Sequence, residues 1–388
     1  MKTALLAAAV SSALTAHAFA APNTLPTGEQ IVGGSATVSR PADARMQIDQ
    51  ASQRAIINWQ SFSIGANARV NVAQPGASSV LLNRVVGNSP TEIFGQLTAS
   101  GQVFLVNPSG VLFAPGASVE VGGLFASSLG VANEDFMAGQ YRFSRNGAAG
   151  DVINQGNIVA LNGYAALAGP RVRNEGTIVA HLGTVALAAG ERITLDLVGD
   201  GLINVSVSQS ALNASAVNTG TLHANGGKVL MTARSANALL DTVINTSGTI
   251  RANRMEERDG VIVLDANGRI DGDGILEASG TITINESGGI SGGSPVLPPH
   301  PGPILNTESP RSIINWESFD ISASEAVQFV QAAGTLSLTS ALRTATTANT
   351  PIHGSLMLTN QVGQLPPLQH SIVSTGVSVP TDALFVLK

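Results

Sequence analysis

The sequence predicts an all-β protein built as a parallel β-helix, a solenoid in which short strands of successive coils stack on one another. One observation is a repeat in the middle of the chain, whose two best copies are offset by 20 residues. A second is the alternation of apolar residues at period two within each copy, as in strands with one buried face. A third is composition: 42 glycines and only 4% aromatic residues suit narrow coils with tight corners.

The chain begins with the features of an export signal. Lys2 gives a basic start, an apolar stretch follows, and residues 18–20 (AFA) form a small-x-small cleavage site. The apolar stretch is too short to span a bilayer as a helix, and no later apolar run is long enough. We therefore expect residues 1–20 to be a signal peptide cleaved after Ala20, and the protein to enter the periplasm.

The repeat is clearest where "NQGNIVALNGYAALAG" from Asn154 is set above "NEGTIVAHLGTVALAA" from Asn174. The common pattern is Asn-x-Gly-x-Ile/Leu-x-Ala, then Gly, then Val/Ala-x-Leu. The step from Gly176 to Gly220 is 44 residues, which we interpret as a double step. Looser copies begin at Asn218, Asn245 and Gly272.

A single copy cannot bury its apolar face, so neighbouring copies must stack. Small inward residues (Ala and Val) suit a narrow coil interior, and the recurring Asn can form side-chain hydrogen-bond ladders. We expect the recurring Gly to supply corners with φ > 0. A β-sandwich would explain neither the fixed offset nor the recurring Asn, so residues 151–293 are predicted to be β-helix repeats.

Between residues 33 and 129 the repeat is absent and several distinctive phrases take its place. They are "INWQSFSIG", "LLNRVVGNSPTEIFGQL" and "GQVFLVNPSGVLF", and "VALAAGERITLDLVGDGLINVSV" follows later. Together they resemble the N-terminal secretion domain of the filamentous hemagglutinin family, the exoproteins of two-partner secretion in Gram-negative bacteria. The resemblance covers most of residues 30–290.

The resemblance implies a right-handed parallel β-helix with an N-terminal cap and extra β-hairpins, in which residues 21–150 form the N-terminal part with the cap. It implies a non-enzymatic exoprotein with a hemagglutinin-like or adhesin-like binding role, secreted through the periplasm or held at the cell surface. The implied partner is an outer-membrane β-barrel transporter with periplasmic polypeptide-binding domains. A host-cell surface or a glycan remains open as the final target.

The resemblance also directs attention to a secretion or folding motif. In the NPSG sequence, Asn at the first position, Pro at the second and Gly at the fourth are type I turn preferences; the family has Asn or a close variant where this chain has Ser109. We expect the motif to act through the fold, and the two aromatic rings to be core anchors. Its residues are Asn107, Pro108, Ser109, Gly110, Asn58, Trp59, Phe62, Asn83 and Arg84.

Other chemistry finds little support in the sequence. A net charge of −6 argues against nucleic-acid binding, and the absence of Cys excludes thiolate metal sites and Cys nucleophiles. Residues 265–277 (DANGRIDGDGILE) resemble a calcium loop, but Arg269 takes a position that needs an oxygen ligand, so we expect a solvated turn. Neither a metal nor a cofactor is expected, because no two of these histidines have metal-ligand spacing: His181, His223, His300, His353 and His370.

Two alternative functions stay open: a haem- or haemopexin-acquisition exoprotein, which uses similar domain sequence, and a polysaccharide-active β-helix enzyme. The second is disfavoured because Asp and Glu are spread one or two per repeat instead of clustering as catalytic carboxylates do.

The C-terminal part differs in composition. Residues 294–310 hold six of the 18 prolines and are predicted to be a stiff linker. Beyond it, "RSIINWESF" repeats the earlier "RAIINWQSF", and 11 of 21 aligned positions are identical between residues 54–74 and 311–331. Residues 311–388 are thus expected to be a partial second copy of the secretion-domain start, with the Trp phrase as its initiating cap strand. A truncated or degenerate exoprotein is a further alternative.

Overall fold

The computed structural model describes residues 20–285 except 148, 162, 198–201, 238–241, 256–257, 259, 273 and 280–281. From residue 286 onward it describes only the backbone of the strands. The predicted signal peptide, apart from Ala20, therefore lies outside the described residues.

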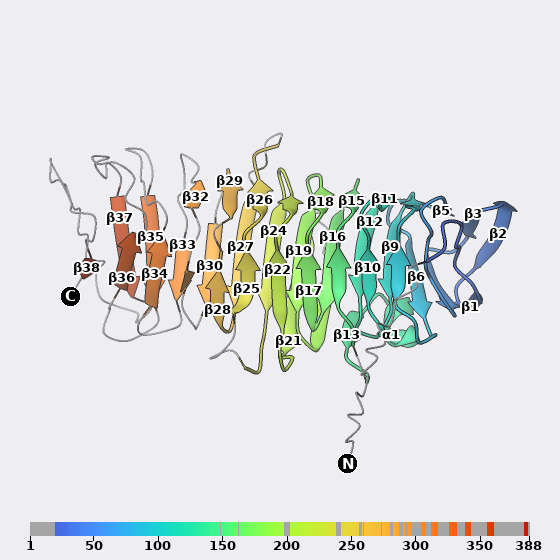
Figure 1. Ribbon diagram of the computed structural model, residues 1–388, viewed down its shortest axis with the longest axis horizontal. Coiled ribbons are helices and arrows are strands. Elements are labelled where there is room, and N and C mark those ends of the chain that lie inside the picture. The colour runs from blue at the N-terminus through green and yellow to red at the C-terminus, as the bar shows by residue number, and fades with distance from the viewer. Residues whose placement is uncertain are drawn as a thin grey trace, which may run out of the picture.

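Strands of successive coils form three long sheets that run the length of the molecule (Figure 1). Sheet 1 has 13 strands in the order β1 (Gln30–Gly33), β4 (Arg54–Trp59), β6 (Val80–Val85), β9 (Gln102–Val106), β12 (Gly123–Ser127), β16 (Tyr164–Gly169), β19 (Thr184–Ala189), β24 (Lys228–Ala233), β27 (Val261–Ala266), β30 (Ile282–Glu286), β33 (Ile304–Thr307), β35 (Ala326–Gln331) and β37 (Ser355–Asn360).

The other two long sheets have 11 strands each. Sheet 2 contains β2 (Ala36–Ala42), β3 (Arg45–Gln50), β5 (Arg69–Ala73), β8 (Gln96–Ala99), β11 (Ser118–Val121), β15 (Asn157–Ala160), β18 (Thr177–Ala180), β23 (Thr221–His223), β26 (Thr249–Ala252), β29 (Ile275–Ala278) and β32 (Ser294–Val296). Sheet 3 contains β7 (Thr91–Ile93), β10 (Val111–Phe113), β14 (Val152–Asn154), β17 (Arg171–Asn174), β22 (Ser215–Asn218), β25 (Thr242–Thr246), β28 (Arg269–Asp271), β31 (Ile290–Ser291), β34 (Ser312–Trp316), β36 (Leu338–Leu342) and β38 (Leu384–Val386).

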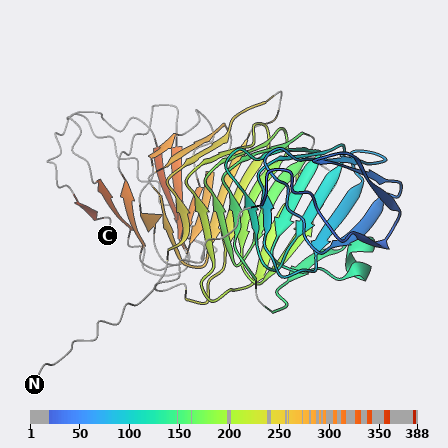
Figure 2. The same cartoon turned by 45° about the vertical axis from the view of Figure 1, so that its right-hand side comes forward.

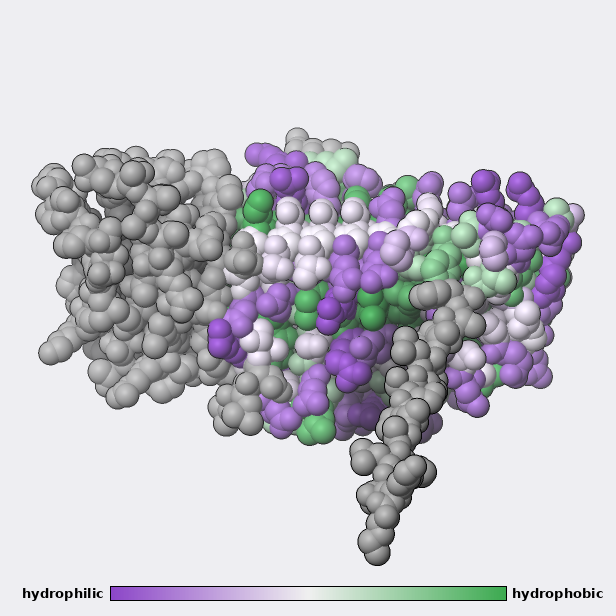
Figure 3. Space-filling view, in the orientation of Figure 1, coloured by the Kyte–Doolittle hydropathy of each residue, from purple (hydrophilic) through white to green (hydrophobic). Residues whose placement is uncertain are grey.

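Stacking follows the sequence repeat, which confirms the predicted parallel β-helix. Asn157 of β15 pairs with Thr177 of β18 in parallel register, and Tyr164 of β16 pairs with Thr184 of β19, both at the offset of 20 residues. Inward Ala, Val, Ile and Leu side chains from all three sheets form one continuous core along the coil axis. On the outside, large exposed apolar side chains of the described region are scattered, and Figure 3 shows mostly hydrophilic and neutral surface on the face in view.

The recurring Asn forms the predicted ladder inside the coil. Asn154 Nδ2 donates to Asn174 Oδ1 at 2.8 Å, and Asn174 Nδ2 donates to Asn218 Oδ1 at 2.8 Å; all three side chains are fully buried. The next position is Thr246 rather than Asn245, because Asn218 pairs with Thr246 in the strand register. Asn218 Nδ2 donates to Thr246 Oγ1 at 3.4 Å, which extends the ladder by one coil.

The recurring Gly has a different role from the predicted one. Gly156, Gly176, Gly220 and Gly248 are not among the glycines with positive φ. A Cβ at Gly176 would meet the backbone of Gly156, and one at Gly220 would meet the backbone of Gly176. The expectation of φ > 0 is wrong for this motif position, which needs Gly because adjacent coils approach closely.

The step of 44 residues is a single coil with an insertion, not a double step. Thr177 pairs directly with Thr221, so β18 and β23 are neighbours. The extra residues form β20 (Arg192–Asp196) and β21 (Asn204–Gln209), an antiparallel hairpin that joins β13 (Tyr141–Ser144) in a separate three-stranded sheet.

This outer sheet and α1 (Asn133–Met137) cover the outer face of sheet 1 (Figures 1 and 2). Between them lies a second apolar cluster in which Phe104 and Phe125 of the coil contact Phe143 of β13. Phe136 of α1 packs edge-on against Phe104 with ring centroids 5.6 Å apart. The extra β-elements thus bury apolar surface that a bare coil would expose.

The N-terminal end is capped by two antiparallel strands. β1 pairs with β4, and β2 pairs with β3, in contrast to the parallel pairing of the coils. The first Trp phrase lies in β4, which begins the parallel series of sheet 1 by pairing with β6. The cap itself is therefore β1 and β2, whereas the Trp phrase forms the first strand beneath it.

The second Trp phrase lies in a different place from the first. β34 belongs to sheet 3, between β31 and β36, whereas β4 belongs to sheet 1. Within the predicted linker, β32 and β33 pair in parallel with β29 and β30. The side chains of these segments lie outside the described residues, so the boundaries at 294–310 and 311–388 stay predictions.

Candidate functional site

The NPSG sequence forms a tight turn between β9 and β10. Gly110 N donates to Asn107 O at 2.9 Å, which closes the turn, and Ser109 N donates to Asn107 Oδ1 at 2.9 Å. Gly110 has φ +109°, and a Cβ there would lie 2.9 Å from Asp151 O. Gly is thus required both by its backbone conformation and by the neighbouring coil.

Hydrogen bonds fasten the turn to the coil before it. The fully buried Asn107 donates through Nδ2 to Ser89 O and to Thr91 Oγ1, both at 3.0 Å. Ser109 Oγ donates to Asn88 O at 3.0 Å. The NPSG turn therefore stacks on the "GNSPT" turn, and Ser109 supplies one of the hydrogen bonds between the two turns.

The coil after the turn is attached in the same way. Gly150 N donates to Pro108 O at 2.8 Å, and Val111 N donates to Asp151 O at 3.0 Å. Three successive coils are thus joined at this corner. In a chain that has folded up to Val111, Pro108 O and Val111 N are available to bind the backbone of the next coil.

Trp59, Phe62 and Asn83 form a buried group on the inner side of sheet 1. The Trp59 and Phe62 rings meet edge-to-face with centroids 5.3 Å apart, and both are essentially unexposed. Trp59 Nε1 donates to Asn83 Oδ1 at 3.0 Å. Asn83 Nδ2 is buried without a hydrogen-bond partner among the described residues. The burial of both rings agrees with the expectation that they are core anchors. A role of these residues in secretion stays a prediction.

Arg84 points to the other side of the sheet and holds the loop that leads into α1. Its Nη2 donates to Val131 O at 2.8 Å, and its Nη1 donates to Asn133 Oδ1 at 2.6 Å and to Asn58 Oδ1 at 3.5 Å. Burial lowers the pKa of the Arg84 guanidinium from its usual value, and the charge of Glu134 partly opposes this. An arginine nevertheless stays protonated in proteins, so Arg84 is a permanent cation.

Arg84 and the NPSG turn meet at one open groove of about 640 Å³. Its wall is formed by the end of β6 with the loop that follows, by the NPSG turn, by the segment before α1, and by the end of β13 with the residues after it. The structure thus brings Arg84, Pro108 and Ser109 together at the surface. By contrast, Trp59, Phe62 and Asn83 lie in the core, and Asn107 lies beneath the turn. Further lining comes from Val85, Val86, Gly87, Asn88, Val106, Ser128, Gly130, Val131, Ala132, Ser144 and Asn146.

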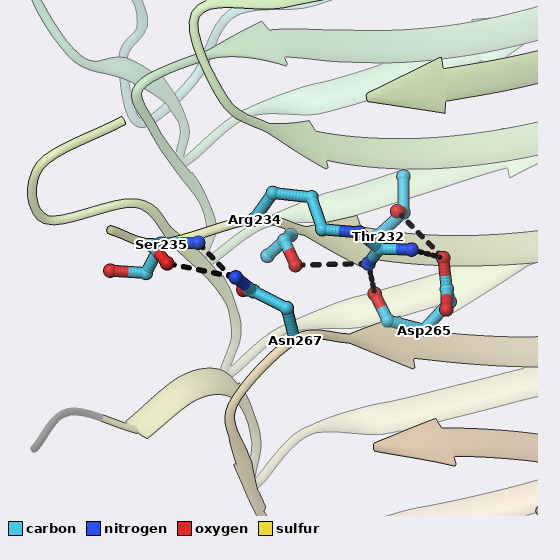
Figure 4. Close-up of polar contacts among 6 residues, drawn as sticks. Thr232, Arg234, Ser235, Asp265 and Asn267 are labelled. Carbon is cyan, nitrogen blue, oxygen red and sulfur yellow. Dashed lines mark hydrogen bonds and ion pairs between the residues drawn. The ribbon is translucent and has the colours of Figure 1, made fainter. Parts of the chain in front are cut away.

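The described acids of residues 265–277 do not form a solvated turn, so that expectation is wrong for them. Asp265, Asp271 and Glu277 lie on β27, β28 and β29, and each pairs with an arginine on its own coil or the one before. Asp265 Oδ2 accepts from Arg234 Nη2 at 2.6 Å and from Thr232 Oγ1 at 3.2 Å (Figure 4). Asn267 exchanges hydrogen bonds with the Ser235 backbone at 2.7 and 2.8 Å, so these contacts join adjacent coils.

Within the described part of the chain, no group of three or more His, Cys, Asp and Glu side chains is arranged to hold a metal ion. His181 is exposed after β18 and His223 is half-buried at the end of β23. The other three candidate histidines lie outside the described residues. No described helix is long and apolar enough to cross a membrane.

Sequence reasoning missed the residues that receive the motif's hydrogen bonds. Ser89, Thr91, Val131 and Asn133 bind Asn107 or Arg84, mostly through short polar or backbone groups. The "GNSPT" phrase could have indicated Ser89 and Thr91. It and the NPSG sequence each hold a Pro, and the two prolines are 18 residues apart, so two turns at this spacing would stack in a coil of that length. No sequence signal placed Val131 beside Arg84, because its contact is through a backbone carbonyl.

Comparison with known proteins agrees with this architecture. Residues 21–285 match the family model described as TPS secretion domain. Two curated relatives named heme/hemopexin-binding protein, both from Haemophilus influenzae, are 33% identical over 261 residues and 29% identical over 273 residues. These alignments cover 65% and 64% of this chain, but only 28% and 29% of the relatives. The chain therefore spans less than a third of the length of either relative.

Among solved structures, the HMW1 secretion domain from Haemophilus influenzae superposes with a TM-score of 0.64 at 24% sequence identity. The match covers 79% of this chain and 87% of that domain, and it shows a shared fold. With the family match over residues 21–285, the chain belongs to the TPS secretion domain family.

Proposed function

We propose that this protein is the exoprotein of a two-partner secretion system. An outer-membrane β-barrel transporter recognises its N-terminal domain through periplasmic polypeptide-binding domains and carries the chain to the cell exterior. The match of residues 21–285 to the secretion domain family carries this proposal. The coil architecture supports it, because a domain whose coils stack one after another can fold progressively as it emerges.

The motif residues have two roles in this proposal. Asn107, Pro108, Ser109 and Gly110 join three coils at one corner and so favour the growth of the β-helix outside the cell. Asn58, Trp59, Phe62, Asn83 and Arg84 fix the first coils, which the rest of the chain uses as a template. Cleavage after Ala20 would begin the mature chain at Ala21, whose carbonyl lies against Gly65 of the first coil.

Secretion of residues 1–293 from a Gram-negative host tests the proposal. With the cognate transporter the domain should appear in the medium, with Ala21 as its first residue by mass spectrometry. Without the transporter it should stay in the periplasm. Equal release with and without the transporter would refute the proposal.

For the secreted protein we propose a non-enzymatic binding role of the adhesin type, directed at a host-cell surface or a glycan. The spread of Asp and Glu at one or two per repeat supports this over polysaccharide cleavage, which needs paired carboxylates. Binding of the mature protein to cultured epithelial cells, with no release of reducing sugar from a polysaccharide panel, is the expected result.

A haem- or haemopexin-acquisition role is a second candidate, favoured by the names of the two curated relatives. A saturable Soret shift on titration of the mature chain with haemin would support this role, and its absence together with no binding to haemopexin would exclude it.

A further inference from the structure

The groove beside the NPSG turn has the chemistry of a binding site. Its volume of about 640 Å³ falls in the range of ligand sites. Four valines lie among its lining residues, and Val86, which is 50% exposed, is the most accessible of them. Hydroxyl and amide groups from Ser109, Ser144 and Asn146 make the polar part. Arg84 is the only charged residue in this lining.

Arg84 makes no ion pair with a described carboxylate. Its hydrogen bonds go to two neutral amide oxygens and a backbone carbonyl, and the charge of Glu134 acts on it without a hydrogen bond between the two side chains. Three such bonds leave two of the five N–H donors of a guanidinium unused. A half-buried cation with unused donors strongly favours an anionic acceptor, and a carboxylate can be bound by two parallel hydrogen bonds.

The lining restricts what kind of anion fits. No aromatic side chain lines the groove, so it offers no ring on which a sugar could stack. A single cation does not make the basic track that a nucleic acid needs. No carboxylate lines the groove, so it does not suit a metal ion. Apolar valines around one cation instead match an acidic side chain flanked by apolar residues.

We propose that this groove binds an extended polypeptide segment through an Asp or Glu side chain that pairs with Arg84. The flanking apolar side chains of the segment contact Val86 and Val131, and the hydroxyl groups bind its backbone. This inference is independent of the transporter assignment, because it concerns a surface of the folded domain.

The test uses the full mature chain and two peptides that differ only in charge. N-acetyl-Val-Glu-Val-amide should bind saturably in calorimetric titration or by NMR shift changes. N-acetyl-Val-Gln-Val-amide should bind about tenfold more weakly or worse, since a hydrogen bond to a charged group is worth about that factor. Equal affinities, or no saturable binding of the Glu peptide up to about 10 mM, would overturn the proposal.

Protein variants locate the binding without replacing Arg84. Val86→Glu places a carboxylate at the exposed edge of the groove, where it competes for Arg84, whereas Val86→Gln has nearly the same shape without the charge. The Glu peptide should lose at least about tenfold in affinity for Val86→Glu and keep wild-type affinity for Val86→Gln. Wild-type affinity in Val86→Glu, or equal losses in both variants, would show that the peptide does not bind at Arg84.

Discussion

Replacement of Asn174 by Ala should destabilise the β-helix more than its small change in size suggests. Asn174 is the middle of the buried ladder, where it accepts from Asn154 Nδ2 and donates to Asn218 Oδ1, each at 2.8 Å. It also donates to Thr221 O at 3.3 Å. In Asn174→Ala, Asn154 Nδ2 keeps its weaker contacts with Gly156 O and Thr177 O. Asn218 Oδ1, however, loses its donor inside a fully buried site.

The magnitude follows from these partners. A buried acceptor left without a donor costs about 1–3 kcal/mol, and each lost hydrogen bond contributes about 0.5–1.5 kcal/mol net. The free energy of unfolding should therefore fall by about 2–4 kcal/mol. For a chain of this size that corresponds to a urea midpoint about 1 M lower.

Urea unfolding of the mature chain, followed by far-UV circular dichroism, measures this change. Asn157→Ala is the matched control, because Asn157 lies at the exposed start of β15. Its free energy of unfolding should change by less than about 0.5 kcal/mol. Equal midpoints for Asn174→Ala and Asn157→Ala would show that the ladder contributes nothing beyond ordinary side-chain contacts, and the reasoning would be wrong.

Substitutions at three further positions should lower stability by different amounts. Trp59→Ala should lower the free energy of unfolding by about 3–5 kcal/mol. Trp59→Phe should lower it by less, because an aromatic ring remains in the core although the hydrogen bond to Asn83 is lost. Equal losses for the two variants in calorimetry would contradict this. Pro108→Ala should cost about 0.4–1 kcal/mol by freeing the unfolded chain, and an unchanged urea midpoint would show that Pro does not preset the turn. Gly220→Ala should cost about 1–3 kcal/mol because its Cβ meets the Gly176 backbone, whereas Gly76→Ala, with open space around it, should be tolerated; equal thermal midpoints for the two would refute the close-approach argument.

Much of the coil could be predicted because its determinants are local and periodic. The offset of 20 residues fixes the strand register, and a buried amide repeated at that offset has its nearest partner one coil away. The NPSG turn was also predictable, since Pro presets φ at the second turn position and Gly accepts the positive φ found at the fourth.

The outer layer could not be predicted in this way. Phe104 and Phe125 lie on strands that are buried on both faces, and such apolar runs do not reveal what covers the second face. The covering residues Phe143 and Ile193 come from strands whose sequence does not repeat. For the same reason the step of 44 residues looked like two units, although it is one coil interrupted by β20 and β21.

Ion pairs between coils were also missed. Asp265 and Arg234 are 31 positions apart, yet they lie on adjacent coils. Spacing within one segment suggested a turn for the acids of residues 265–277, whereas Asp265, Asp271 and Glu277 lie on strands of three different sheets. The partners of Asp265 and Glu277 lie on the coil before, so only the register of neighbouring coils shows them.

The central claim is that the NPSG residues act through folding of the β-helix and not as direct contacts to the transporter. Asn107→Ala tests it most directly, because Asn107 is fully buried and bonds only within the fold. The measurement compares two quantities for wild type and variant: the affinity of the urea-unfolded chain, diluted from denaturant, for the transporter's periplasmic domains, and the refolding rate of the free chain. Unchanged affinity with slower refolding is the predicted result, whereas lost affinity with an unchanged refolding rate would contradict the claim.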